Sequence, residues 1–490
     1  METIRVPSWT HLLLGALGAT LLSLPSTSLA ESANSRPQLS PESVAQYDAK
    51  AQVMKENGHI LKAMMDSEHA GFGGDVSHAI ANRMASRTDE AAITDAREKL
   101  DIQSYGEGTW LLRFPWVNVA VFETSEGLVL VDSGYAPAGP ALVEALRKIS
   151  KKPVHTIIYT HHHLDHAYGA WALLEAGETP RIIAEERFLH EMGLDIRLAN
   201  YTNARLNNQN PRDVPRKWAD VIAPTETFRG ETTLVIGGEE FVLTHARGET
   251  TDHIWVRVPS RDTVVSGDYH QPFLPNAGNG KRRQRYLQEW AEALREMASL
   301  EPALLLPAHG AAITNPVDIQ EKLGVVASAF ESIVQQVVEG LNAGLRQDEV
   351  VASVSLPPEL DGHADLEPYY NTVPDLAKMV VREYSGWWDG RPANWAPAPL
   401  AAQGRAIVEL AGGISPLVKK ARTLLESDPQ MASHLVDWAL FAEPDNPEVL
   451  QLGLETYARR IRPGLPLQEI TVYLEHMANM KRRLNNLAER

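Results

Sequence analysis

The sequence predicts an α/β domain followed by an all-α domain, and three observations support this prediction. Between residues 101 and 315, short apolar runs typical of β-strands alternate with helical patterns. From residue 316 onward the pattern is helical, with short turns that contain proline or aspartate. The third observation is a histidine-rich run at residues 160–169, which directly follows a predicted strand.

Length, charge and composition restrict the class of protein. The chain has 490 residues, which is enough for two or three domains. A net charge of -17 argues against a nucleic-acid partner. The absence of cysteine excludes disulfides, thiolate ligands and cysteine nucleophiles. Any metal site must therefore be built from histidine, aspartate and glutamate.

The first residues are typical of an export signal. Arg5 precedes a short apolar stretch at residues 12–24, and Ser28-Leu29-Ala30 forms a small-residue cleavage site. We therefore expect a signal peptide at residues 1–30 and a periplasmic or secreted mature protein without a membrane span. Residues 31–100 are predicted to form a helical segment that wraps the catalytic domain.

The α/β region is predicted to be the catalytic domain, residues 101–315. Its first half contains predicted strands at residues 109–114, 118–123, 127–132 and 154–159, and a predicted helix at residues 139–150. Its second half contains predicted strands at residues 233–236, 240–244, 253–258, 263–266 and 303–306, and a predicted helix at residues 285–298. A helical domain is expected at residues 316–470, with helices at 401–411, 416–426, 429–442 and 446–461, and a C-terminal helix at residues 471–490.

The run Thr160-His161-His162-His163-Leu164-Asp165-His166 places four metal-ligand side chains within six positions. His161 and His163 can bind one metal ion, and Asp165 and His166 can bind a second beside it. This donor set suits Zn²⁺, with manganese and iron as competitors. The alternative is a histidine-rich surface loop. The position after a buried strand favours a ligand site, because open α/β sheets bind ligands at such ends.

The remaining ligands must come from distant strand ends. Asp268 follows the apolar strand at 263–266 and can bridge two metals, because a carboxylate has two oxygens. His309 follows the strand at 303–306 and can complete the second metal's shell. Each could instead be a capping or core residue. Three residues are candidates for the third ligand of the first metal: His245, Glu249 and His253. His245 could instead orient a ligand, and His253 could instead be a core histidine.

Together the ligand loop, Ser266-Gly267-Asp268 and Ala308-His309-Gly310 resemble the metallo-β-lactamase superfamily. The resemblance implies an αββα sandwich with two metals at one edge. Most members have histidine where this chain has Glu249, and a glutamate there is similar to the alkyl sulfatase branch. It implies that Glu249 is a ligand of the first metal.

The helical region resembles the same branch. Residues 384–394 are similar to a Gly-Trp-Phe-Asp-Gly motif of alkyl sulfatases, and residues 409–413 and 441–447 resemble their dimerisation domain. The resemblance implies a homodimer. The stretch after Asp268 departs from the branch, because its histidine pair is reduced to His270 and its sulfate-binding arginine falls near Lys281 and Arg282.

These features predict a dinuclear zinc hydrolase, with two Zn²⁺ per chain, that cleaves an alkyl sulfate. The expected substrate is a small anion with an apolar tail, which Lys281 and Arg282 would hold by its sulfate. Asp165 and His270 are the predicted catalytic residues, with Asp165 helping to activate water. Two alternatives stay open: the same site acting on a lactone, another ester or a β-lactam, and a catalytically silent assembly protein.

Overall fold

The computed structural model describes residues 85–115, 117–199, 215–462 and 465–488. The described residues fall into two compact units, which divide between Asp389 and Gly390. The predicted signal peptide and most of the predicted helical wrap lie outside the described residues. Of that wrap, the structure describes helix α4 (Glu90–Glu98), whose first turn is capped by the Asp89 carboxylate accepting from the Ala92 amide.

The first unit contains two β-sheets. The first sheet has seven strands in chain order: β1 (Asp101–Ser104), β2 (Thr109–Arg113), β3 (Asn118–Glu123), β4 (Leu128–Val131), β5 (Val154–Ile158), β6 (Arg181–Glu185) and β7 (Glu226–Phe228). Strands β1 to β4 pair antiparallel, and β4 to β7 pair parallel. The parallel strands β4 and β5 therefore end at the same edge.

The second sheet has five strands in the order β12-β11-β10-β9-β8. Their bounds are β8 (Glu231–Ile236), β9 (Glu239–His245), β10 (Ile254–Val258), β11 (Thr263–Gly267) and β12 (Leu304–Pro307). All neighbours pair antiparallel except β11 and β12, which are parallel. Because β11 and β12 run in the same direction, the residues that follow them meet at one edge.

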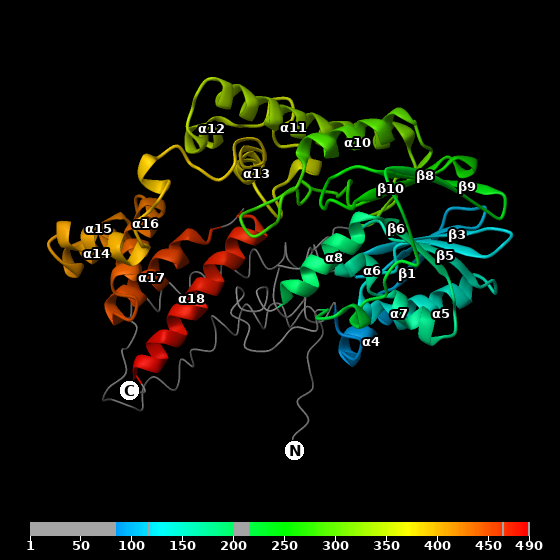
Figure 1. The fold of residues 1–490 in the computed structure, drawn as a ribbon, viewed down its shortest axis with the longest axis horizontal. Coiled ribbons are helices and arrows are strands. Elements are labelled where there is room, and N and C mark those ends of the chain that lie inside the picture. Colours follow the sequence, from blue (N-terminus) through cyan, green and yellow to red (C-terminus); the bar gives the residue numbers. More distant parts are fainter. Residues whose placement is uncertain (1–84, 116, 200–214, 463–464, 489–490) are drawn as a thin grey trace, which may run out of the picture. The chain divides into compact units, whose positions relative to one another are not determined.

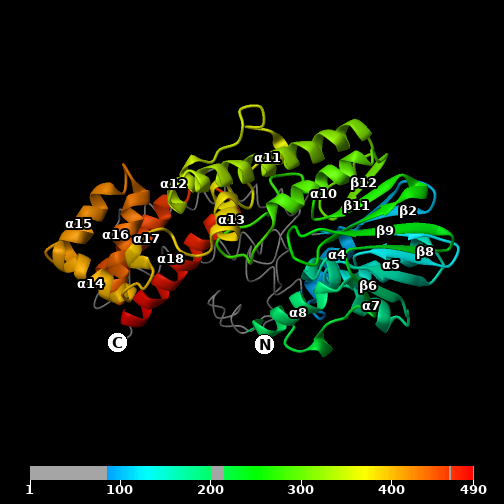
Figure 2. The same cartoon turned by 45° about the horizontal axis from the view of Figure 1, so that its top comes forward.

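Helices cover the outer faces of both sheets. On one side lie α5 (Gly139–Ile149), α6 (Leu164–Ala167), α7 (Ala170–Glu175) and α8 (Arg187–Arg197), and on the other lie α10 (Leu287–Ser299) and α11 (Pro316–Asn342) (Figure 1, Figure 2). The same unit continues through α12 (Gln347–Ser353) and α13 (Val373–Ser385). The predicted αββα sandwich is confirmed.

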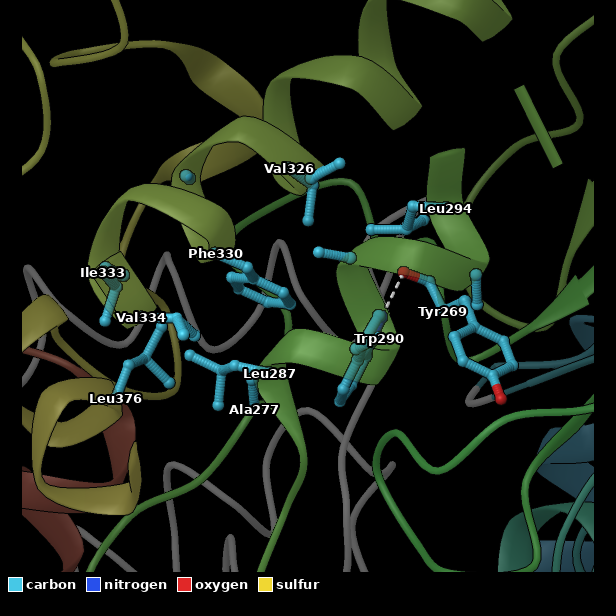
Figure 3. Packing of buried hydrophobic residues seen from close by; sticks show 14 of the residues in the cluster. Tyr269, Ala277, Leu287, Trp290, Leu294, Val326, Phe330, Ile333, Val334 and Leu376 are labelled. Atoms are coloured by element: carbon cyan, nitrogen blue, oxygen red, sulfur yellow. Dashed lines mark hydrogen bonds between the residues drawn. The ribbon is translucent and has the colours of Figure 1, made fainter. Parts of the chain in front are cut away.

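Two apolar cores hold this unit together. The first lies between the sheets, where Phe122 meets Phe241 edge-to-face at a centroid distance of 5.7 Å. The second lies beneath α10 and α11, with Trp290 and Phe330 at its centre (Figure 3). The Trp290 indole N–H donates to the Tyr269 carbonyl at 2.9 Å. The core thereby supports the loop that follows β11.

The second unit is helical. It comprises α14 (Leu400–Leu410), α15 (Ile414–Leu424), α16 (Pro429–Ala442), α17 (Pro447–Arg460) and α18 (Leu467–Ala488). Buried side chains such as Val418, Val436 and Leu450 form its core. Asp428 and Asn446 cap α16 and α17, which explains the sharp turns predicted from sequence. Within the described residues, no helix is long and apolar enough to cross a membrane.

Gly169, the last residue of the histidine-rich run, is closely packed against the backbone of a neighbouring segment. A Cβ added there would lie 2.0 Å from the Ser133 carbonyl oxygen, which is backbone and cannot move aside. We expect Gly169→Ala to lower the free energy of unfolding by about 1–3 kcal/mol, the usual cost of overpacking. Denaturant titration measures this change. Gly193→Ala in α8 is the control, because its Cβ meets only Trp218 at an ordinary 3.5 Å; equal losses would contradict the explanation.

Candidate metal centre

The loop after β5 brings its four predicted ligand side chains to one place. His161, Asp165 and His166 are buried, whereas the His163 side chain keeps 20% of its surface exposed. His161 Nε2 lies 2.9 Å from His163 Nδ1, and the rings of His161 and His166 are 4.1 Å apart. The short helix α6 begins after His163, so one helical turn places Asp165 and His166 beside the preceding histidines.

Glu249 joins this loop from the connection between β9 and β10. Its Oε1 lies 3.6 Å from His163 Nδ1. One donor atom each from His161, His163 and Glu249 lie within 4.8 Å of one another, which suits a single metal ion. The structure thus brings together the three residues predicted for the first metal.

Asp268 and His309 complete the cluster from the ends of β11 and β12. His309 Nε2 lies 3.0 Å from Asp268 Oδ1, and His166 Nε2 lies 3.4 Å from the same oxygen. A second compact group consists of Asp165, His166 and His309, and a third of His161, His166 and Asp268. Asp268 therefore lies next to both groups of residues that would each hold an ion, which is the position that a bridging carboxylate needs.

The donor atoms fit bound divalent metal. Two buried atoms, Glu249 Oε2 and His166 Nε2, have no hydrogen-bond partner among the described residues, and the nearest neighbours of Asp268 Oδ1 are the imidazoles of His309 and His166. Buried polar atoms without a partner are costly, so each needs a cation or another partner. Imidazole and carboxylate donors without thiolate suit zinc, manganese or iron. The residues present therefore fit a centre for two ions.

Asp132 holds this loop in place from the end of β4. It accepts hydrogen bonds from the Thr160 amide (2.7 Å) and hydroxyl (2.9 Å), and it contacts His166 Nδ1 at 2.8 Å. A carboxylate on Nδ1 leaves Nε2 directed at the metal and fixes the ring. Asp132 has a left-handed backbone with φ of 66°. The sequence analysis did not assign it a role, although the Asp132-Ser133-Gly134 strand end was the available signal.

The two competing histidines lie outside the ligand groups. His253 Nε2 accepts a hydrogen bond from the Asp268 amide at 3.2 Å, and its ring stacks on Tyr269 at 4.0 Å. His245 Nε2 contacts the Thr251 carbonyl at 2.8 Å, two residues beyond Glu249. Both side chains therefore contact backbone next to a ligand rather than the ligand groups themselves.

The residues predicted to bind the substrate, Lys281 and Arg282, and the predicted catalytic residue His270 have different surroundings. Burial lowers the pKa of His163 well below its usual range, and the charges of His162, Arg285 and Arg282 lower it further. The Lys281 amide donates to Asn279 at 3.0 Å. His270 belongs to none of the ligand groups: burial lowers its pKa to about 4, and the charges acting on it are Asp365 and Lys322.

Arg285 is a site residue whose contact with a metal ligand was not predicted, although it ends the basic run at residues 281–285, for which the sequence allows either a helix start or an anion-binding role. Its guanidinium Nη1 lies 2.7 Å from Glu249 Oε1, and both side chains are almost fully buried. It also donates to the Asn276 carbonyl. The Asn276 side chain is buried too, and its amide nitrogen has no partner among the described residues. A positive charge therefore lies beside the first metal group, and the backbone of Asn276 contacts the same guanidinium.

Protonation of Glu249 couples metal binding to pH. Burial raises the pKa of Glu249 to about 7, and Arg285 only partly opposes this rise. Burial would also raise the pKa of Asp268, but His309 and His166 outweigh it and hold that pKa well below its usual range. In metal-free protein below pH 7, Glu249 therefore carries a proton that a metal must displace.

We expect Zn²⁺ binding to metal-free protein at about pH 6 to release protons, and Glu249→Gln to release about one fewer. Apparent zinc affinity should rise as the pH approaches the Glu249 pKa of about 7. Calorimetry in buffers with different ionisation heats counts the protons. A binding heat that does not depend on the buffer would contradict this expectation.

Comparison with known proteins agrees with the fold and with the binding of divalent metal. The model of the metallo-β-lactamase superfamily matches residues 116–309, and the alkyl sulfatase dimerisation model matches residues 346–481. A linear primary-alkylsulfatase from Pseudomonas sp. is 30% identical over 369 residues, which cover 70% of this chain and 69% of that protein. An (R)-specific secondary-alkylsulfatase from Pseudomonas sp. is 24% identical, covering 68% and 55%. The chain thus spans little more than half the length of that second relative.

A solved structure shares the fold across both units. The stereoselective inverting sec-alkylsulfatase from Pseudomonas sp. superposes with a TM-score of 0.67 at 21% identity, covering 92% of this chain and 79% of that one. The two-sheet sandwich and its cluster of histidines and carboxylates define a metal-dependent hydrolase of the metallo-β-lactamase superfamily. Within it, the chain belongs to the alkylsulfatase family.

Proposed function

We propose that this protein is a dinuclear zinc enzyme that hydrolyses alkyl sulfate esters to an alcohol and hydrogen sulfate. The observation that carries the proposal is the pair of guanidinium groups beside the first metal group. Arg285 contacts Glu249, and both Arg285 and Arg282 lower the pKa of His163. A sulfate ester carries a permanent negative charge that matches these cations, whereas a lactone is neutral. The named activities of the alkylsulfatase relatives support the same substrate class.

The proposed division of labour follows from the positions of the side chains. His161, His163 and Glu249 would hold one zinc ion, Asp165, His166 and His309 the other, and Asp268 would lie between them. Divalent metal bound there would supply Lewis acidity, which lowers the pKa of water and polarises an ester oxygen. Arg282 and the Asn276 amide would bind the sulfate oxygens and orient the ester. Arg285 would lower the pKa of Glu249 and thereby ease the loss of its proton when metal binds.

Release of sulfate from a soluble ester tests the proposal. Zinc-loaded protein should release inorganic sulfate from octyl sulfate, and a chelator should abolish the release until zinc is restored. The same preparation is assayed on a lactone and a β-lactam. Hydrolysis of either of these with no sulfate release from any alkyl sulfate would overturn the substrate class. Fewer than two metals per active chain would overturn the dinuclear centre.

Export and assembly belong to the same proposal. The leader-like pattern at residues 1–30 supports export to the periplasm or the medium. The match to the alkyl sulfatase dimerisation model supports a homodimer built through the helical unit. Cell fractionation tests the first, and sedimentation of the purified protein tests the second. A cytoplasmic full-length chain or a monomer at micromolar concentration would contradict the respective proposal.

A further inference from the structure

His162, the middle residue of the three consecutive histidines, makes contacts away from both metal groups. It is fully buried, and its Nδ1 lies 2.9 Å from the Asp252 carboxylate. Its Nε2 lies 3.1 Å from Arg283 Nη2 and 3.5 Å from Asp195. The ring is therefore held at both nitrogens and cannot rotate without losing two contacts. Because His161 and His163 are its chain neighbours, an anchored His162 fixes the backbone that carries both ligands.

Arg283 connects this anchor to helix α8. Its Nη2 lies 3.0 Å from Asp195 Oδ1 and 3.1 Å from Glu191 Oε2. These two carboxylates are four residues apart in α8 and therefore lie on the same face. The other oxygen of Glu191 accepts a hydrogen bond from the Thr251 hydroxyl at 2.5 Å. We refer to His162, Glu191, Asp195, Asp252 and Arg283, with Thr251, as the α8 network.

The α8 network reaches three segments that carry site residues. His162 stands between two ligands, and Thr251 and Asp252 follow the ligand Glu249 within three residues. Arg283 directly follows Arg282 and precedes Arg285 by two residues. One short helix face thus holds the loop of the first metal, the loop of Glu249 and the cationic segment at residues 281–285. A misplacement of about 1 Å at a reacting site can lower the rate about a hundredfold, so holding these three segments in place should affect activity.

We propose that Arg283 is a positioning residue, which acts through the α8 network to hold Arg282 in place for binding the sulfate group and Arg285 in place against Glu249. This role rests on the proposed sulfatase function. An ordinary exposed ion pair contributes little to stability. Arg283 differs because one of its nitrogens lies within 3.1 Å of three side chains, those of His162, Glu191 and Asp195, and the first two are buried.

The variant Arg283→Met tests the proposal against a matched control, Arg295→Met. The two arginine side chains are 43% and 45% exposed, and Arg295 also pairs with a helix carboxylate, Glu331, away from the site. In Arg283→Met we expect the KM for octyl sulfate and the inhibition constant of inorganic sulfate to rise together by about tenfold, with metal content unchanged. Arg295→Met should change neither value. Arg283→Lys keeps the positive charge but not the planar guanidinium, so its KM and its sulfate inhibition constant should lie between those of wild type and Arg283→Met.

Hydrogen–deuterium exchange gives a readout that does not need activity. Amides of residues 281–285 should exchange faster in Arg283→Met than in wild type or Arg295→Met. If exchange and the sulfate inhibition constant both stay at wild-type values, the proposal is overturned. It is also overturned if exchange accelerates while sulfate binding is unchanged, because the network is then only structural. If Arg283→Met does not fold, Glu191→Gln replaces it under the same criteria.

Failure of the proposed function is distinguishable from failure of the positioning role. If wild-type protein releases no sulfate from octyl sulfate, the proposed substrate is wrong. Binding of inorganic sulfate to the zinc-loaded protein, measured by calorimetry, and the exchange comparison still decide whether Arg283 positions the cationic segment.

Discussion

Replacing Asp268 by asparagine (Asp268→Asn) is expected to lower kcat for an alkyl sulfate by about 10³-fold, because charge stabilisation at a metal centre is worth several kcal/mol. Asp268 Oδ1 approaches His166 at 3.4 Å and His309 at 3.0 Å in the second group, and Asp268 also forms a compact set with His161 of the first group, so its carboxylate lies next to both. An amide has one oxygen and no charge. The variant should also retain about one metal per chain instead of two.

Metal analysis and steady-state kinetics on the same preparation check this result. Asp262→Asn is a suitable control, because Asp262 lies in a left-handed turn with φ of 45°, a conformation that asparagine tolerates. It should keep both metals and full activity. An Asp268→Asn enzyme with two metals and more than about a tenth of wild-type kcat would show that Asp268 does not bridge.

The second large effect concerns the buried ion pair of Arg285 and Glu249. Removing one partner of such a pair leaves an uncompensated charge, so we expect Arg285→Met to destabilise the metal-free protein by about 3–5 kcal/mol at a pH above the Glu249 pKa of about 7, where the carboxylate is ionised. The two side chains are 3% and 1% exposed, so water screens little of their interaction. Bound zinc should reduce the loss, since it supplies Glu249 with another cation.

A double-mutant cycle separates this pair from simple packing. Glu249→Gln with Arg285→Met removes both charges and should recover part of the lost stability, which denaturant titration of the metal-free proteins measures. The loss should also depend on pH. The folded-state pKa of Glu249 is raised to about 7, so its protonated form stabilises the fold at low pH and this stability is lost as pH rises through that value. An Arg285→Met defect that is independent of pH would point to packing instead.

The sandwich and the ligand cluster could be predicted largely because their signals are local. The run from Thr160 to Gly169 carries four ligands in one loop, and apolar strands precede Asp268 and His309 in sequence. Strands β1, β6 and β7 were not predicted. β7 has only three residues, with Glu226 and Thr227 exposed, and so lacks the buried alternation that marks a strand.

Site residues defined by distant partners escaped prediction. Arg285 reads as the start of a helix, and only its contact with Glu249 explains the burial of its guanidinium. His270 was predicted to be catalytic because it is what remains of the histidine pair in the alkyl sulfatase motif. In the structure it belongs to no ligand group, and the charges that act on it are those of Asp365 and Lys322, which lie far away in the sequence.

The spread of the ligands along the chain makes metal content a measure of completed folding. Donors lie between His161 and His309 and come from the ends of strands in both sheets, so a full coordination shell exists only after the two sheets have packed together. Conversely, bound ions close loops of up to that length and act as reversible crosslinks that oppose chain opening. The metals would therefore slow unfolding as well as serve the reaction, and their removal would shorten the lifetime of the folded enzyme.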